Sequence, residues 1–311
     1  MAGGFKKSID ICGSETLTEV RRQNNPADRE AVKLLSQYRT HDALTMFEET
    51  GSIIIEETEL AADSRLVDDY VEAYTKKAEE LDRSNHRVAD SLVVCSHTNA
   101  SVVKFNSEIR ERLKQNGILK YSKVGIVGLF RRKGGVVNVG NKRMELLPGE
   151  QIVFTGNLNY EESSDVFNSE VGTVLSVNWV DKQGFGYIAV LVNKADGSLE
   201  QVVLDTKKLS EYPGSILDYG YAVTAYKLQG ATIDQTFIRH GSNIGYETFN
   251  VMMSRHRENV WLYADRKTLH DALYATLDKN IVKARYRYNL EAKPGQNLDM
   301  LGLKSHIINS L

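Results

Sequence analysis

The sequence predicts an α/β protein in which a small β-barrel is inserted into a domain built on a parallel sheet. Three observations lead to this fold class. A buried-strand pattern at 91–95 runs directly into an amphipathic helix at 100–116, which is the building block of a parallel sheet. Between about 124 and 212 the composition shifts toward Gly, Val, Thr and Asn in alternating strands. From Tyr221 the strand–helix rhythm returns.

The first part of the chain predicts mainly helix. Apolar positions at helical spacing predict one helix over 26–50, with Pro26 in its first turn and Asp28 near the positive end of its dipole. The β-branched run 53–55 predicts a short strand. A second, acidic helix is expected over 60–82.

The middle of the chain predicts alternating strands at 151–154, 172–177 and 187–192. Asp196-Gly197 stands between two such runs and is a strong hairpin-turn signal. A last strand is expected at 259–263, and residues 278–311 predict a tail of mixed helix and linker.

Composition excludes several classes of protein. With 41% hydrophobic and 26% charged residues, the chain has the make-up of a globular protein with a real core. The net charge of -2 gives no global positive field, although a local basic face remains compatible with it. Cys12 and Cys95 lack CxxC spacing, so neither a disulfide framework nor a metal site is expected. No apolar run reaches the ~18 residues of a membrane span, so we expect a cytoplasmic protein without a membrane partner.

Residues 221–234 carry the strongest chemical signal. A small apolar strand runs into a polar turn that holds Lys227, Gln229 and Gly230. Glycine lets the backbone approach a ligand closely, and Thr224 and Thr232 can donate to phosphate beside the lysine charge. The alternative is an ordinary strand-to-helix turn with one exposed lysine.

Two further segments are rich in arginine. In 248–259, Arg255 and Arg257 flank His256, and in 17–23 two adjacent arginines precede a helix. A planar guanidinium binds phosphate oxygens in bidentate fashion, and one aimed at a γ-phosphate accelerates its transfer by roughly 10³–10⁵. The alternative for both segments is a basic surface that faces water. We expect His240 and His256 to be surface or structural residues.

In this order the three segments resemble motifs IV, V and VI of superfamily 1 helicases of the RecD-like branch. The match is best to the helicase part of TraA-type conjugative relaxases, and the stretch 97–113 resembles the same family. Segments 147–154 and 166–174 resemble the SH3-like barrel inserted in the second RecA-like domain of this family. The resemblance implies a discontinuous RecA-like domain at 1–140 and 213–277, a barrel at 141–212 and a tail at 278–311.

The resemblance also implies roles for individual residues. Arg22 and Arg255 would reach the γ-phosphate across the cleft between two motor domains. The residues at or near the nucleotide would be Gln23, Gln229, Gly230 and Arg257. Single-stranded DNA would lie near Thr98, Asn99, Thr224, Tyr226 and Lys227. The sequence departs from the family at Tyr226, which stands for the usual histidine and can still stack on a base, and at Leu228, which stands for a serine.

The residues that cradle phosphates are missing. The chain has no Gly-Lys dipeptide and therefore no G-x-x-x-x-G-K-[ST] loop, so the acidic strand 53–57 is not expected to act as a Walker B strand. We expect a chain cut at a domain junction that uses ATP and Mg²⁺ only together with a first RecA-like domain, in the same or another chain. Alone it is not expected to hydrolyse ATP. The alternatives are a non-enzymatic single-stranded DNA-binding module and an inactive remnant of a transfer gene.

Overall fold

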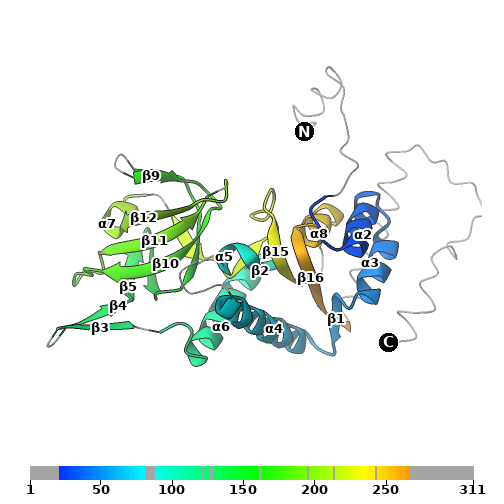
Figure 1. Cartoon of the computed structure of the whole chain (residues 1–311), viewed down its shortest axis with the longest axis horizontal. Helices are drawn as coiled ribbons and strands as arrows, with labels where there is room; N and C mark the ends of the chain where they lie inside the picture. Colours follow the sequence, from blue (N-terminus) through cyan, green and yellow to red (C-terminus); the bar gives the residue numbers. More distant parts are fainter. Residues whose placement is uncertain are drawn as a thin grey trace, which may run out of the picture.

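The computed structural model describes residues 21–80, 88–120, 122–126, 129–160, 163–194, 196–212, 214–241 and 244–266. Two parts lie side by side: an α/β part around a parallel sheet, and a β-rich part at the left of Figure 1. Cys12, most of segment 17–23 and the predicted tail 278–311 fall outside the described residues. Among the helices of the described residues, none is both long enough and apolar enough to cross a membrane.

The α/β part is built on five parallel strands. Their order across the sheet is β1 (Ile53–Glu56), β16 (His256–Asp265), β15 (Ile233–Arg239), β2 (Leu92–Ser96) and β14 (Ala222–Thr224). Every neighbouring pair is parallel. All five residues of β2 are buried, as expected for a central strand covered on both faces. The predicted parallel sheet is confirmed, and it fits a RecA-like α/β fold.

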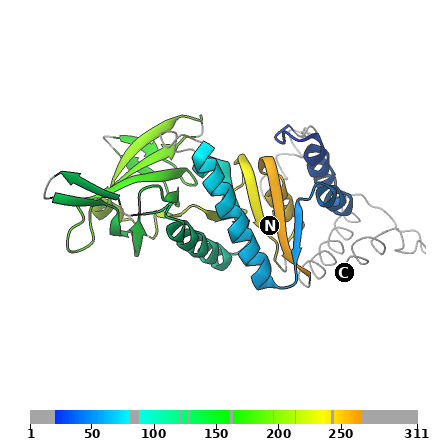
Figure 2. The same ribbon diagram turned by 60° about the horizontal axis from the view of Figure 1, so that its bottom comes forward.

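Helices cover both faces of this sheet. One face is covered by α2 (Pro26–Ser36), α3 (Thr40–Glu49) and α8 (Tyr246–Met253), whose apolar side chains share one core with the strands. The other face is covered by α4 (Glu59–Glu80) and α6 (Asn99–Gln115), and the short α5 (Val88–Ser91) leads into β2. Figure 2 shows α4 in front of the strands.

The single helix predicted over 26–50 is wrong, because the chain turns between α2 and α3. Tyr38 has a φ of 64°, in the left-handed region that a right-handed helix cannot contain. Its ring stacks on Tyr246 of α8 with 4.4 Å between ring centroids. The apolar residues of both helices face the same core, so their spacing along the sequence hides the break.

The β-rich part is antiparallel. Its main sheet has the order β12 (Leu199–Asp205), β11 (Tyr187–Asn193), β10 (Val171–Asn178), β7 (Gln151–Phe154) and β13 (Leu217–Tyr219). Three hairpins and one short helix surround it: β3 (Ser122–Ile126) with β4 (Leu129–Lys133), β5 (Gly135–Val139) with β6 (Lys142–Leu146), β8 (Leu158–Tyr160) with β9 (Ser163–Val166), and α7 (Thr206–Leu209).

This antiparallel unit, β3 to β13, has an apolar core of its own. The predicted Asp196-Gly197 turn joins β11 to β12: Gly197 has a φ of 83°, and the Asp196 carboxylate accepts from the backbone N–H of Ser198 at 2.9 Å. The strands extend beyond both ends of 141–212. The SH3-like description and the domain limits stay predictions.

A buried ion pair joins the two parts. Arg110 of α6 donates from Nε to Glu150 Oε1 at 2.7 Å and from Nη2 to Oε2 at 3.0 Å. The Tyr221 hydroxyl donates to the same carboxylate at 2.9 Å, and the Arg110 guanidinium lies 4.0 Å from the centre of the Tyr219 ring. Burial raises the pKa of the Glu150 carboxyl, and the Arg110 guanidinium opposes that shift. Because Glu150 directly precedes β7, this cluster fixes the antiparallel unit against α6.

We expect Glu150→Ala to lower the free energy of unfolding by about 3–5 kcal/mol, because it removes the fully buried carboxylate partner of Arg110 and leaves that charge with the partly exposed Glu145 at 3.5 Å. Asp218→Ala is the matched control. It breaks an exposed ion pair with Lys142 and should cost less than about 1 kcal/mol. Urea unfolding followed by circular dichroism measures both. Equal losses in the two variants would contradict the role given to the buried pair.

Candidate functional site

Two guanidinium groups meet at the N-terminal ends of β15 and β16. Arg22 donates from Nε to Thr232 Oγ1 at 3.0 Å and from Nη1 to the Ser254 carbonyl at 2.8 Å. Arg255 donates from Nε to the Val251 carbonyl at 3.1 Å and from Nη2 to Ser254 Oγ at 3.2 Å. The structure thus brings together two residues that lie far apart in the sequence. We call this region the arginine edge, defined by Arg22, Thr232, Ser254 and Arg255.

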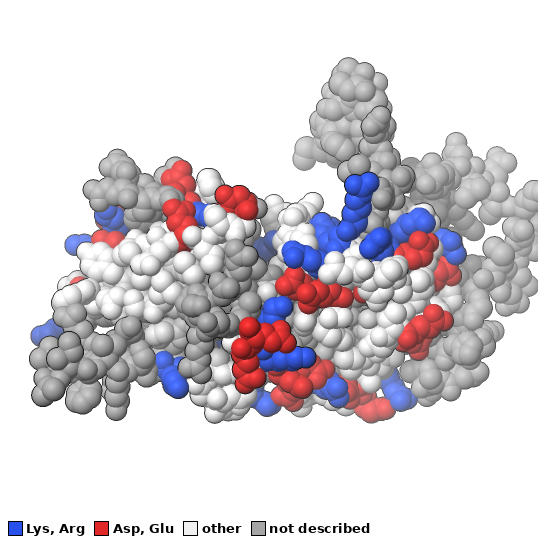
Figure 3. Space-filling model, in the orientation of Figure 1, with Lys and Arg blue, Asp and Glu red and all other residues white. Residues whose placement is uncertain are grey.

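Among the residues that the structure describes, no carboxylate pairs with the two guanidinium groups of the arginine edge. The partners of both groups there are hydroxyl and carbonyl oxygens. Burial lowers the pKa of Arg22, and burial followed by the Arg22 charge lowers the pKa of Arg255. In Figure 3 Lys and Arg side chains gather along the top of the α/β part, over the region of α2 and α8. Such an arrangement favours an anionic ligand.

Buried polar groups hold the arginine edge in place. Gln23 is 1% exposed and donates its side-chain amide to the carbonyls of Ser254 and His256, each at 3.1 Å. The backbone N–H of Asn24 donates to the Arg257 carbonyl at 2.7 Å. His256 is fully buried against the edge of Phe47 and is therefore structural and not on the surface. In this structure the Gln23 amide positions the turn that carries Arg255.

The remaining residues expected near the nucleotide lie on exposed segments. The Arg257 side chain is half exposed and pairs with Asp234 at 3.4 Å. Gln229 and Gly230 are exposed in the loop 225–232, where Gly230 has a φ of 91° that favours glycine. The loop ends at Thr232, which accepts the hydrogen bond from Arg22. Gln229 and Gly230 therefore come directly before the arginine edge in the sequence.

The residues expected near DNA lie at the opposite, C-terminal ends of the strands. β14 and β2 are neighbours, and Thr224 is in register with Ser96. Thr98 caps α6 by accepting from the backbone N–H of Ser101 at 3.1 Å, and Asn99 is exposed beside it. We call this region the C-terminal edge, defined by the strand ends Ser96 and Thr224 and the segments that follow them.

Three consecutive residues after β14 differ in their surroundings. The Tyr226 side chain is 82% exposed. Lys227 is partly buried, and burial lowers the pKa of its ammonium group while Asp218 opposes the shift. Leu228 is only 3% exposed and packs into the core under α2 and α8. The departure from serine at this position therefore removes a hydroxyl that would have faced the core, and not a ligand.

Sequence reasoning missed a charged cluster at the C-terminal ends of β2 and β15. Arg239 is buried between Asp63 and Asp265, and Lys104 pairs with the same Asp63 carboxylate. His240 is 5% exposed, so it is buried and not on the surface. Burial, followed by the charge of Arg239, lowers the pKa of His240 to about 4. No local pattern signals this cluster, because Arg239 and Asp63 are 176 residues apart.

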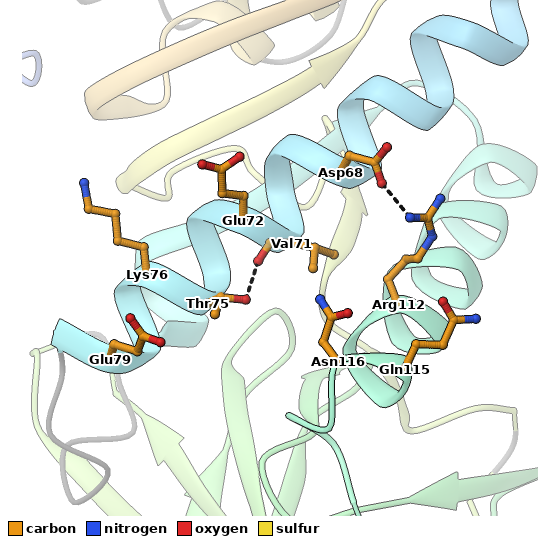
Figure 4. A pocket seen from close by; sticks show the side chains of 9 residues that line it. All are labelled: Asp68, Val71, Glu72, Thr75, Lys76, Glu79, Arg112, Gln115 and Asn116. Atoms are coloured by element: carbon orange, nitrogen blue, oxygen red, sulfur yellow. Dashed lines mark hydrogen bonds and ion pairs between the residues drawn. The ribbon is translucent and has the colours of Figure 1, made fainter.

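A groove of about 470 Å³ lies between α4 and α6 (Figure 4). Arg112 and Asp68 point toward each other across it and form an ion pair of 2.8 Å. The Thr75 hydroxyl donates to the Val71 carbonyl at 2.7 Å. None of the buried, unpartnered polar atoms of the described residues lines this groove, so it is a weaker candidate than either edge. Within the same residues, no group of three or more His, Cys, Asp or Glu side chains is placed to hold a metal ion.

Three relatives found by comparing sequences are all named TraA. No family model matches the chain. It is 27% identical over 259 residues to the conjugal transfer protein TraA of Agrobacterium fabrum, and 24% identical to a probable conjugal transfer protein TraA of Sinorhizobium fredii. The chain is similar to TraA-type conjugal transfer proteins. This confirms the resemblance found in the motifs. Each match covers 83% of this chain but only 20% of the relative, so the chain spans about a fifth of the TraA proteins that it matches.

Solved structures of Pif1 helicases also match. The Bacteroides enzyme in complex with ADP-AlF3 and ssDNA has a TM-score of 0.44 at 16% identity, covering 87% of this chain and 56% of that chain. Pif1 helicase from Candida albicans has a TM-score of 0.47 at 13% identity, covering 86% of this chain and 59% of that chain. No functional assignment follows from similarity at this level.

We expect acid to destabilise the protein through His240. Its folded pKa of about 4 lies below the ordinary value of ~6.5, so the unfolded chain takes up a proton between these pH values that the folded chain does not. The stabilisation is present above pH ~6.5 and is lost as the pH falls toward 4, by about 3 kcal/mol in total. Urea unfolding at a series of pH values measures the slope. His240→Phe should flatten it, and an unchanged slope in this variant would contradict the assignment.

Proposed function

We propose that this chain is the C-terminal motor half of an ATP-dependent DNA helicase of conjugative DNA transfer. The observation that carries the proposal is the arginine edge, where Arg22 and Arg255 meet at Ser254 without a carboxylate partner among the described residues. The similarity to TraA proteins, whose name refers to conjugal transfer, supports the process. We also assign the antiparallel unit to the SH3-like insert predicted at 141–212.

The free donors of the arginine edge fit a phosphate. Arg22 uses Nε and Nη1 for its protein partners, and Arg255 uses Nε and Nη2. With respect to the described residues, each guanidinium therefore keeps one nitrogen that can donate to an oxyanion. In phosphoryl transfer negative charge spreads over the equatorial oxygens of the γ-phosphate, and a guanidinium there stabilises the transition state. The phosphate loop and the ligands of Mg²⁺ would come from a first RecA-like domain in the same or another chain.

The loop 225–232 links this edge to the DNA. It leaves β14 at the C-terminal edge, where Thr224 and Tyr226 lie, and it ends at Thr232, which contacts Arg22. Leu228 packs its middle into the core between the two ends. This connection would couple the occupancy of the nucleotide site to movement along a strand.

We expect Arg255→Lys to lower the DNA-stimulated ATPase rate by about 10³-fold or more when the chain works with a first RecA-like domain. Lysine keeps the charge but loses the planar fork that Arg255 presents. The affinity for single-stranded DNA should not change. Arg65→Lys is the control, because Arg65 forms an exposed pair with Asp69 on α4. An undiminished rate in Arg255→Lys would remove the basis of the proposed function.

A second candidate function is single-stranded DNA binding without catalysis, which the exposed Tyr226 beside Lys227 favours. Tyr226→Ala should weaken binding of a labelled oligothymidine by about 5- to 100-fold, because a stacked base contributes roughly 1–3 kcal/mol. Tyr226→Phe should bind like the unchanged chain. Affinity should fall steeply with salt. If the chain binds single-stranded DNA but no first RecA-like domain restores ATPase activity, it is a binding module. If it neither binds DNA nor restores ATPase activity, it is an inactive remnant.

A further inference from the structure

A small cavity of about 150 Å³ lies between the C-terminal ends of β2 and β15. Ser96 and His97 line it from the β2 side, and Arg239, His240 and Gly241 line it from the β15 side. The two strands are neighbours, but the helices that follow them separate: α6 covers one face of the sheet and α8 the other. In open α/β sheets this divergence leaves a crevice at the carboxyl ends of the strands, where ligands bind.

The cavity contains buried polar atoms that lack partners. Ser96 is 1% exposed and His240 is 5% exposed, yet Ser96 Oγ and His240 Nδ1 form no hydrogen bond, and neither does His97 Nδ1. A Cβ atom at Gly241 would lie 2.5 Å from the His97 ring, so only glycine leaves room for this imidazole. Buried polar groups are almost always hydrogen-bonded. The residues that carry these three atoms line one cavity, and a ligand in it can supply the missing partners when their side chains turn toward it.

The charges around the cavity are already paired. Arg239 is bound to Asp63 and Asp265, and Lys104 is bound to Asp63. Glu59 is an exposed carboxylate at the rim. Burial and Arg239 lower the pKa of both histidines, so their imidazoles are neutral at pH 7. The groups left for a ligand are a hydroxyl and two neutral imidazoles, which donate or accept according to rotamer and tautomer. They fit a neutral ligand with both donors and acceptors better than an anion.

We propose that this cavity binds the hydrogen-bonding edge of one unpaired nucleobase of single-stranded DNA. The inference rests on the proposed function, which places the strand at the same edge through Thr98, Asn99 and Tyr226. Base edges present donors and acceptors side by side, as the three unpartnered atoms require. The cavity of about 150 Å³ is small, so it takes the edge of one base and not a whole nucleotide.

The test compares labelled strands of equal length that carry thymine, adenine or abasic residues, each titrated into the full chain by fluorescence anisotropy. The thymine strand should bind more tightly than the abasic strand, which loses both the cavity contact and the stacking on Tyr226. Ser96→Ala should weaken thymine binding about three- to tenfold, the effect of one or two hydrogen bonds, and should leave abasic binding unchanged. It should not lower the melting temperature, because it deletes a hydroxyl without a partner. Thr236→Val is the matched control: it removes another buried, unpartnered hydroxyl, on β15 outside the cavity lining, and should not change binding.

The outcomes separate this inference from the proposed function. Equal affinity for all three strands, unaffected by Ser96→Ala, overturns the base site and leaves strand binding intact. An equal loss of thymine and abasic binding in Ser96→Ala also overturns it, because the cavity would then hold backbone phosphate. Failure to bind any strand overturns the placement of DNA at the C-terminal edge, and the base site with it.

Discussion

Two positively charged guanidinium groups lie close together at the turn that contains Ser254. Arg22 and Arg255 both contact Ser254, both are partly buried, and their described partners carry no negative charge. Taking a charge out of water without a counter-ion is unfavourable, so other contacts must hold this arrangement. The buried Gln23 amide and the Asn24–Arg257 backbone hydrogen bond supply them. Proteins keep unfavourable arrangements of this kind mainly at functional sites.

The parallel sheet places the arginine edge and the C-terminal edge at opposite ends of its strands. Because all five strands run in one direction, the arginine edge lies at their N-terminal ends and the C-terminal edge, where we propose that DNA binds, lies at their other ends. The loop 225–232 is one covalent connection between the two edges, and Leu228 packs its middle into the core. The Arg110–Glu150 pair fixes the antiparallel unit against α6, the helix that Thr98 caps. The arginine edge, the C-terminal edge and the antiparallel unit are thus all joined to the same parallel sheet.

Most elements of the fold could be predicted from periodicity, because each is a local pattern. The break at Tyr38 could not, since the apolar residues on either side face the same core. The Arg110–Glu150 and Arg239–Asp63 pairs join residues 40 and 176 positions apart and leave no local signal. The pairing of Arg22 with Arg255 was expected only from family resemblance. The buried role of Gln23 and the unpartnered atoms around His240 needed three-dimensional packing to appear.

The central claim is that the arginine edge is a preformed oxyanion site. It is tested most directly by measuring the melting temperature of the chain as inorganic phosphate replaces chloride at constant ionic strength. A ligand that binds only the folded state raises the melting temperature with its concentration. The account predicts a phosphate-specific rise that disappears when Arg22→Gln and Arg255→Gln are combined. The same rise in the double variant, or none in the unchanged chain, would contradict it.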